Sequence, residues 1–234
     1  MSENKTGKYF KYAIGEIILV VIGILIALQI NNWNEKRQDN YKEQIYLQDI
    51  KASLITDSLR INSILKFNNK KILIVKKLMS IFSDTLNNYQ RFEIINELSE
   101  SFTAYEVFVP KRTTWDNLLS SERLSIVDSK ELRNLLMEFY SFDFNGGVQE
   151  RLKLMNRKVI DNVFPQFFTR EFAEQELGLK TKLSTIKESK ISQNKEFISD
   201  LYGITYLINL QNNFLSNTLN QIKTSLNLIE ENLN

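Results

Sequence analysis

The chain of 234 residues contains no cysteine and no histidine. Without cysteine it can form no disulfide bond, no thiol nucleophile, no zinc–thiolate or iron–sulfur site and no thioester-linked lipid anchor. Without histidine it lacks the commonest general base and the commonest transition-metal ligand. No glycine-rich phosphate loop and no GxSxG motif is present either. The sequence therefore predicts a protein that is not an enzyme and that uses no cofactor and no metal.

Glycine and proline are scarce, with seven and two residues respectively, well below ordinary usage. Neither occurs between Gly23 and Pro110, so this run contains no strong helix breaker. The scarcity predicts an all-α fold with long helices.

Neither sign of charge dominates, since 30 Lys and Arg residues stand against 28 Asp and Glu residues. This balance produces no global field that would attract nucleic acid. A basic stripe with interleaved aromatic residues is also missing. The sequence therefore predicts no nucleic-acid partner.

A long apolar run near the N-terminus predicts a transmembrane helix at residues 13–33. Residues 13–30 read AIGEIILVVIGILIALQI, in which only Glu16 and Gln29 are polar. Tyr12 and Trp33 flank the run, and the 21 residue steps between them span roughly 31 Å, close to the thickness of a bilayer's hydrocarbon core. The predicted partner of this segment is the lipid bilayer.

Two other interpretations of the run remain open from the sequence. Lys5, Lys8 and Lys11 precede it, as they would in a secretory signal peptide, but no small-x-small cleavage site follows it. A buried core helix is the other alternative, although a helix that is apolar on every face suits lipid better.

The distribution of basic residues favours one orientation. Three lysines and the amino terminus precede the apolar run, whereas Lys36, Arg37 and Lys42 follow it among acidic residues. We expect residues 1–12 to form a short cytoplasmic tail and residues 34–234 an extracytoplasmic helical domain. This arrangement corresponds to a single-pass protein of the inner (cytoplasmic) membrane with its soluble domain in the periplasm.

One face of the predicted transmembrane helix suggests an interaction site. Spacings of three and four residues place Glu16, Val20, Gly23, Ala27 and Ile30 on one stripe, and the small-xxx-small pair Gly23 and Ala27 allows close approach of another helix. Gln29 is the second polar residue of the run, and an intramembrane polar group is a candidate for function. Chance spacing, or a Glu16 carboxylate that reaches the headgroups, are the alternatives.

Two stretches resemble a family of uncharacterised single-pass membrane proteins common in Bacteroidetes bacteria. These are GKYFKYAIGEIILVVIGILIALQINNWNE at residues 7–35 and TTWDNLLSSERLSIVDSKELRNLLMEFY at residues 113–140. The family tends to have glycine after the two serines of the second stretch, whereas this chain has Glu122. The resemblance implies a membrane-anchored helical domain and supplies no catalytic residues.

Apolar residues at helical spacing predict two long helices in the remaining chain, at about 41–83 and 196–233. Asn68 interrupts the first apolar stripe, and Gln211 and Thr218 are polar members of the second. The first stretch is therefore either one helix or two helices that meet near Asn68. Antiparallel pairing of the two long helices predicts an elongated bundle.

Shorter elements are expected in a compact, aromatic-rich middle at residues 84–195. We expect a loop at 84–90, a helix at 91–102, an extended segment at 105–110 before Pro110, and a short helix capped by Thr113 or Thr114. Asp128 and Glu131 have capping-box spacing for a helix to about Asp143. A helix from Val148, interrupted at Pro165 and ending at Glu176, and a basic linker at 180–195 complete the middle.

Aromatic residues concentrate in this middle region. The candidates for an apolar pocket that takes a lipid-like or aromatic ligand are Phe139, Phe142, Phe144, Phe164, Phe167 and Phe168; packing into the core is the alternative. Residues 141–152 resemble half a calcium loop but lack its first and last acidic ligands.

These observations favour a membrane-anchored helical scaffold or adaptor that associates with itself, as a homo-oligomer, or with another envelope membrane protein. The alternative is an extracytoplasmic ligand-sensing domain that acts with a partner subunit.

Overall fold

A computed structural model describes residues 5–121 and 124–233, and these are all-α: the structure is 83% helical and contains no strand within those ranges. The sequence prediction of the fold class is therefore confirmed. Glu122, at which the chain departs from the resembled family, lies outside the described residues, as do residues 1–4. The helices are α1 (Lys5–Met79), α2 (Asn88–Thr103), α3 (Thr113–Ser120), α4 (Lys130–Ser141), α5 (Gly147–Val163), α6 (Arg170–Leu177) and α7 (Lys195–Leu233).

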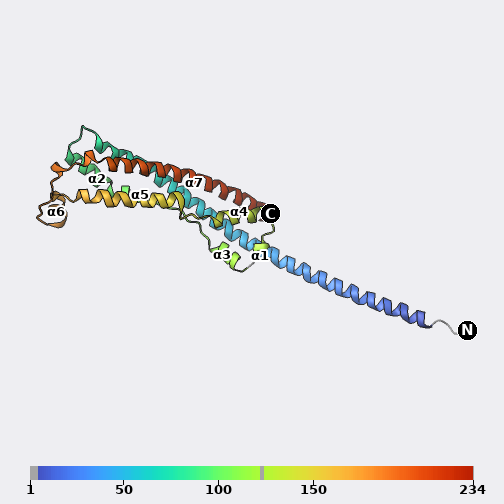
Figure 1. Cartoon of the computed structure of the whole chain (residues 1–234). Helices are drawn as coiled ribbons and strands as arrows, with labels where there is room; N and C mark the ends of the chain where they lie inside the picture. The colour runs from blue at the N-terminus through green and yellow to red at the C-terminus, as the bar shows by residue number, and fades with distance from the viewer. Residues whose placement is uncertain (1–4, 122–123, 234) are drawn as a thin grey trace.

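Helix α1 runs without a break for 75 residues. The predicted transmembrane helix and the first long helix are thus parts of one helix, and no second helix begins at Asn68. Its N-terminal part stands clear of the rest of the protein as a single rod (Figure 1). The apolar window of this helix is long and apolar enough to cross a membrane and is 0% buried, which removes the buried-core interpretation.

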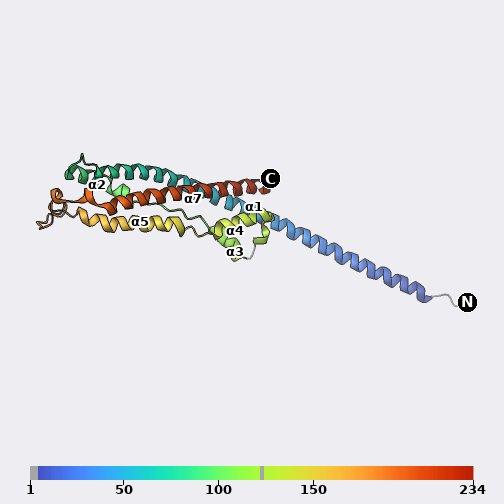
Figure 2. The same cartoon turned by 45° about the horizontal axis from the view of Figure 1, so that its top comes forward.

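The C-terminal half of α1 pairs with α7 in antiparallel orientation, as the sequence predicts (Figures 1 and 2). Leu54 and Ile222 are among the buried residues of this pair. Close to the C-terminus of α7, Gln44 of α1 donates a hydrogen bond to the carbonyl of Asn232 at 3.1 Å. The C-terminal end of α7 therefore lies where α1 enters the bundle.

The remaining helices cover the two ends of this pair. Helices α3 and α4 lie where the rod enters the bundle, α5 runs along α7, and α2 and α6 lie at the opposite end, which we call the distal end (Figures 1 and 2). The apolar core correspondingly divides into two clusters, one around Trp115 and Ile222 and one around Phe197 and Leu201.

A layer of buried polar side chains separates the two clusters and binds the non-helical segment at residues 104–111. We call it the polar layer; it consists of Asp57, Asn68, Lys71, Gln149 and Gln211. Asn68 donates to Gln211 Oε1 at 2.8 Å, so the polar interruptions of the two apolar stripes pair with each other. Five further bonds involve the backbone of the segment, because a chain without regular structure must find partners for its backbone polar groups elsewhere. They run from Gln211 to the Glu106 carbonyl, between Gln149 and both backbone groups of Phe108, from Lys71 to the Ala104 carbonyl, and from the Lys111 amide to Asp57.

Several helix starts differ from the sequence predictions. Ser129, not Asp128, caps α4, since its hydroxyl accepts from the Leu132 amide while the Asp128 amide donates to Glu43 across the bundle. Helix α3 begins at Thr113 without a side-chain cap, so neither threonine caps it. Helix α2 begins earlier than predicted, because Asn87 and Gln90 form a capping box within the predicted loop.

The region predicted as a basic linker contains two short 3-10 turns, Ile186–Glu188 and Ile191–Gln193. Ile191 is buried in the distal cluster, whereas the lysines of the region are exposed. The segment therefore packs against the bundle through its isoleucines.

Candidate functional site

A second apolar stripe runs along α1 on the face opposite the core. Spacings of three, four and seven residues place its members on one side of the helix, whereas the buried residues Leu54 and Ile61 lie on the other. Tyr41 and Leu59 are 70% and 69% exposed. We call this surface the outer stripe; it consists of Tyr41, Ile45, Ala52, Ile55 and Leu59, all of them exposed.

The outer stripe continues the stripe of the apolar segment. Gly23, Tyr41 and Leu59 are spaced by 18 residues, and 18 residues make about five turns of an α-helix. The three residues therefore lie on one line along α1. An added Cβ at Gly23 would meet no atom within 4 Å, so the helix has no neighbour at this point within the described chain.

The membrane-segment candidates lie on the exposed rod. Glu16, Val20, Gly23 and Ala27 share the face that leads into the outer stripe, and all four are exposed. Gln29 lies about 120° round the helix from Gly23 and so faces another direction.

The structure divides the six phenylalanines of the predicted pocket between two places. Phe139, Phe142 and Phe144 lie near α3 and α4, where the Phe139 and Phe144 rings are 5.4 Å apart and both are buried. No pocket is lined by these three residues among the described cavities. The other three lie at the distal end beside α6 and line a pocket: Phe164, Phe167 and Phe168.

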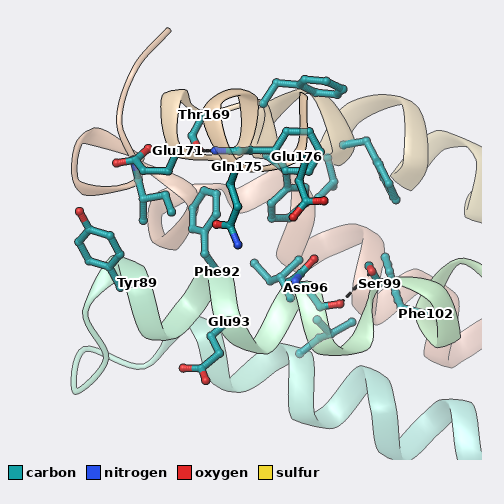
Figure 3. A pocket seen from close by; sticks show the side chains of 18 of the residues that line it. Tyr89, Phe92, Glu93, Asn96, Ser99, Phe102, Thr169, Glu171, Gln175 and Glu176 are labelled. Carbon is teal, nitrogen blue, oxygen red and sulfur yellow. Dashed lines mark hydrogen bonds between the residues drawn. The ribbon is translucent and has the colours of Figure 1, made fainter. Parts of the chain in front are cut away.

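The distal pocket has a volume of about 530 Å³ and lies mainly between α2 and α6 (Figure 3). Its deep wall contains the buried side chains of Phe102 and Phe197. Phe92 from α2 packs edge to face on Phe167 at 5.4 Å. The size and the aromatic walls are typical of sites for small organic molecules.

Polar groups in the pocket come from α2 and α6. The Gln175 amide and the Glu176 carboxylate extend from α6 into the gap, and Asn96 and Ser99 lie opposite on α2 (Figure 3). Glu171 is engaged elsewhere, since it accepts a hydrogen bond from the Ile186 amide at 2.9 Å. The Gln175 amide and the Glu176 carboxylate, in contrast, have no hydrogen-bond partner within the described residues.

The strongly perturbed carboxyl and amino groups lie in the polar layer and not in the pocket. Burial lowers the pKa of Lys71 to about 7. Burial also raises the pKa of Asp57 to about 6, partly offset by its hydrogen bond from the Lys111 amide. Both groups form hydrogen bonds with the backbone of residues 104–111. Their role in holding this segment accounts for their burial and for their shifted pKa values.

The calcium-like segment has a structural role instead. Asp143 Oδ1 accepts hydrogen bonds from the Asn145 and Gly146 amides. A Cβ at Gly146 would lie 2.5 Å from Asp143 Oδ2, so a larger residue here would require the Asp143 carboxylate to move. The turn leads directly into α5.

The outer stripe and the α2 wall of the pocket were not among the sequence predictions. The outer stripe has a sequence signal, because a second set of apolar residues at helical spacing occurs within residues 41–59. The α2 wall has none, since Phe92 and Glu176 are 84 positions apart and no local pattern links them.

Comparison with known proteins gives one family. The model described as Family of unknown function (DUF6090) matches residues 16–160, more than half of the chain. This span covers the outer stripe completely and ends within α5, before α6 supplies its side of the pocket. No curated protein and no solved structure matches the chain. The chain belongs to the Family of unknown function (DUF6090).

Proposed function

We propose that the protein is a membrane-anchored, non-enzymatic scaffold or adaptor that associates with itself through the outer face of α1. The observation that carries this proposal is the exposed apolar outer stripe, which lies in line with Gly23 along α1; residues 34–38 between the two parts and Gln48 within the stripe are polar. Exposed side chains such as Leu59 gain free energy when another surface removes them from water. A group of exposed apolar side chains on one face of a helix is typical of interaction sites.

A second copy of the chain suits this surface because the line passes from the membrane segment into the soluble domain. A partner that covers all of it must itself cross the membrane and continue as a helix at the same height. Copies inserted in the same orientation present the same line in register, which favours a parallel homo-oligomer. Another envelope membrane protein with such a helix is the alternative partner.

The proposed location is the inner membrane, with residues 1–12 in the cytoplasm and residues 34–234 in the periplasm. The basic residues before the apolar run support this orientation. Cysteines introduced at Ser101 and Ser184 should react with a membrane-impermeant thiol reagent in intact spheroplasts, whereas one at Ser2 should not. The reverse pattern would place the helical domain in the cytoplasm. The chain has no native cysteine, so each label reports one position.

Self-association is tested by placing a charge in the outer stripe. Leu59→Glu should weaken association of the full-length protein in mild detergent by about tenfold or more, because the carboxylate would be buried between two copies. Leu154→Glu is the matched control, since Leu154 is also exposed, at 57%, but lies on α5. Sedimentation equilibrium measures the association constant. If both variants self-associate as tightly as the native protein does, the proposal is rejected.

The membrane part of the line has its own test. Gly23→Leu should weaken association by removing the close approach of two helices. Replacing residues 13–30 with a poly-Leu helix of equal length is the control. If that protein associates like the native one, the apolar segment is only a tether.

A second candidate function is an extracytoplasmic ligand-sensing domain that acts with a partner subunit. The open distal pocket favours this candidate. The long helices α1 and α7 would then connect the distal end with the membrane.

A further inference from the structure

We infer that the distal pocket binds a small hydrophobic cation, a molecule with an aromatic or branched apolar body and a quaternary or amine-type positive charge. This inference goes beyond self-association and does not depend on it. The evidence is the combination of walls, charges and free polar groups in the pocket.

The walls fit a compact apolar body. Side chains from α2, α6 and α7, together with the turn after α5, surround a volume of about 530 Å³. Phe164 and Phe168 remain 38% and 51% exposed, although rings of this size are normally covered in a finished core. The pocket is thus an unfilled apolar site with rings on several sides.

The charges select the sign of the ligand. Three carboxylates line the pocket, from Glu93, Glu171 and Glu176, and no lysine or arginine is among its lining residues in the described chain. A positive charge inside it would meet both the carboxylates and the faces of the aromatic rings, which attract cations. An anion would meet repulsion from the same groups.

Glu176 is the residue best placed to hold the charge. Its carboxylate extends into the gap beside the Gln175 amide (Figure 3). Within the described chain no hydrogen bond or ion pair engages it, whereas Glu171 already accepts the Ile186 amide. Glu93 points away from the gap (Figure 3), so it contributes through its field and not by contact.

Two probes of the same shape and opposite charge test the inference. Tetraphenylphosphonium and tetraphenylborate are each equilibrated by dialysis with the full-length protein in phosphatidylcholine nanodiscs, and binding to empty nanodiscs is subtracted. Tetraphenylphosphonium should bind with one site per chain and at least about tenfold more tightly than tetraphenylborate. Equal or tighter binding of the borate, or no binding of either probe above empty nanodiscs, would overturn the inference.

Three variants connect the binding to the pocket. Glu176→Gln should weaken phosphonium binding several-fold, whereas Glu174→Gln, an exposed residue of the same helix that does not line the pocket, should not. Asn96→Trp should abolish binding by filling the space while self-association stays unchanged. Phosphonium binding that survives Asn96→Trp would place the probe elsewhere and reject the site.

Discussion

The two ends of the helical bundle use aromatic side chains in opposite ways. Where α1 enters the bundle, Trp115 stacks on Tyr140 at 5.1 Å and both are 1% exposed. At the distal end, Phe164 and Phe168 stay partly exposed around an open pocket. The same residue type therefore fills a core at one end and lines a cavity at the other.

The difference comes from the helices that cover each group. Trp115 of α3 and Tyr140 of α4 lie in the core that these two helices form with the paired α1 and α7. The distal rings Phe164, Phe167 and Phe168 lie in and beside a short 3-10 turn, Phe164–Phe167, and between α2 and α6, which has only 8 residues. A short helix cannot close both sides of a group of large rings, so aromatic content alone does not predict a closed core.

The largest expected effect is at the closed end. Trp115→Ala should lower the free energy of unfolding by about 3–5 kcal/mol, because it removes a fully buried ring and leaves a cavity. Phe168→Ala at the open end should cost less than about 1 kcal/mol, since half of that side chain is in water. Urea unfolding of the full-length protein in mild detergent, followed by circular dichroism, measures both. Similar costs would mean that the two ends do not differ in packing.

A smaller effect is expected in the polar layer between the two ends. Gln149→Leu removes the partner of both backbone groups of Phe108 and should cost roughly 2–3 kcal/mol, because these groups stay buried without hydrogen bonds. Gln221→Leu, the same change at an exposed position of α7, should change stability by less than about 0.5 kcal/mol. If both variants have the same urea midpoint of unfolding as the native protein, the polar layer does not hold residues 104–111.

The smallest effect is a dependence of stability on pH at Lys71. Its pKa falls from 10.5 in the unfolded chain to about 7 in the folded one, so the unfolded chain binds more protons between these values. Stability should therefore rise with pH across this window. Relative to Lys71→Met, the native protein should gain about 1 kcal/mol between pH 7 and pH 8.

Two features make this pH measurement specific. Asp57 contributes in a lower window, since its pKa rises from 3.8 to about 6, so its effect on stability is complete below pH 7. Lys70→Met is the control, because Lys70 is exposed, and it should keep the native slope. A native slope that persists in Lys71→Met would show that another group is responsible.

Much of the fold follows from local patterns in the sequence. Scarce glycine and proline predicted the long helices, and the apolar stripes predicted the antiparallel pairing of α1 with α7. The polar interruptions Asn68 and Gln211 were visible as exceptions, and their hydrogen bond explains why each is tolerated. Periodicity is informative in these helices because each buries one face along its whole paired length.

The remaining features depend on contacts between distant residues. The cap of α4 was assigned to Asp128, but the Glu43 carboxylate of α1 binds that amide and Ser129 caps instead. The six phenylalanines were close in sequence, yet α5 carries Phe164 to the distal end and leaves Phe139 behind at the other. The local spacing of residues does not reveal how far, or in which direction, α5 carries the chain between them.

The most direct test of self-association through α1 is a scan of single cysteines from Asn40 to Leu59 in native membranes. In a parallel homo-oligomer, each residue of the outer stripe meets the same residue of the other copy. Oxidative cross-linking should therefore peak at Tyr41, Ile45, Ala52, Ile55 and Leu59 and fall between them. Absence of cross-linked dimers at every position, or peaks on a different face of α1, would contradict the account.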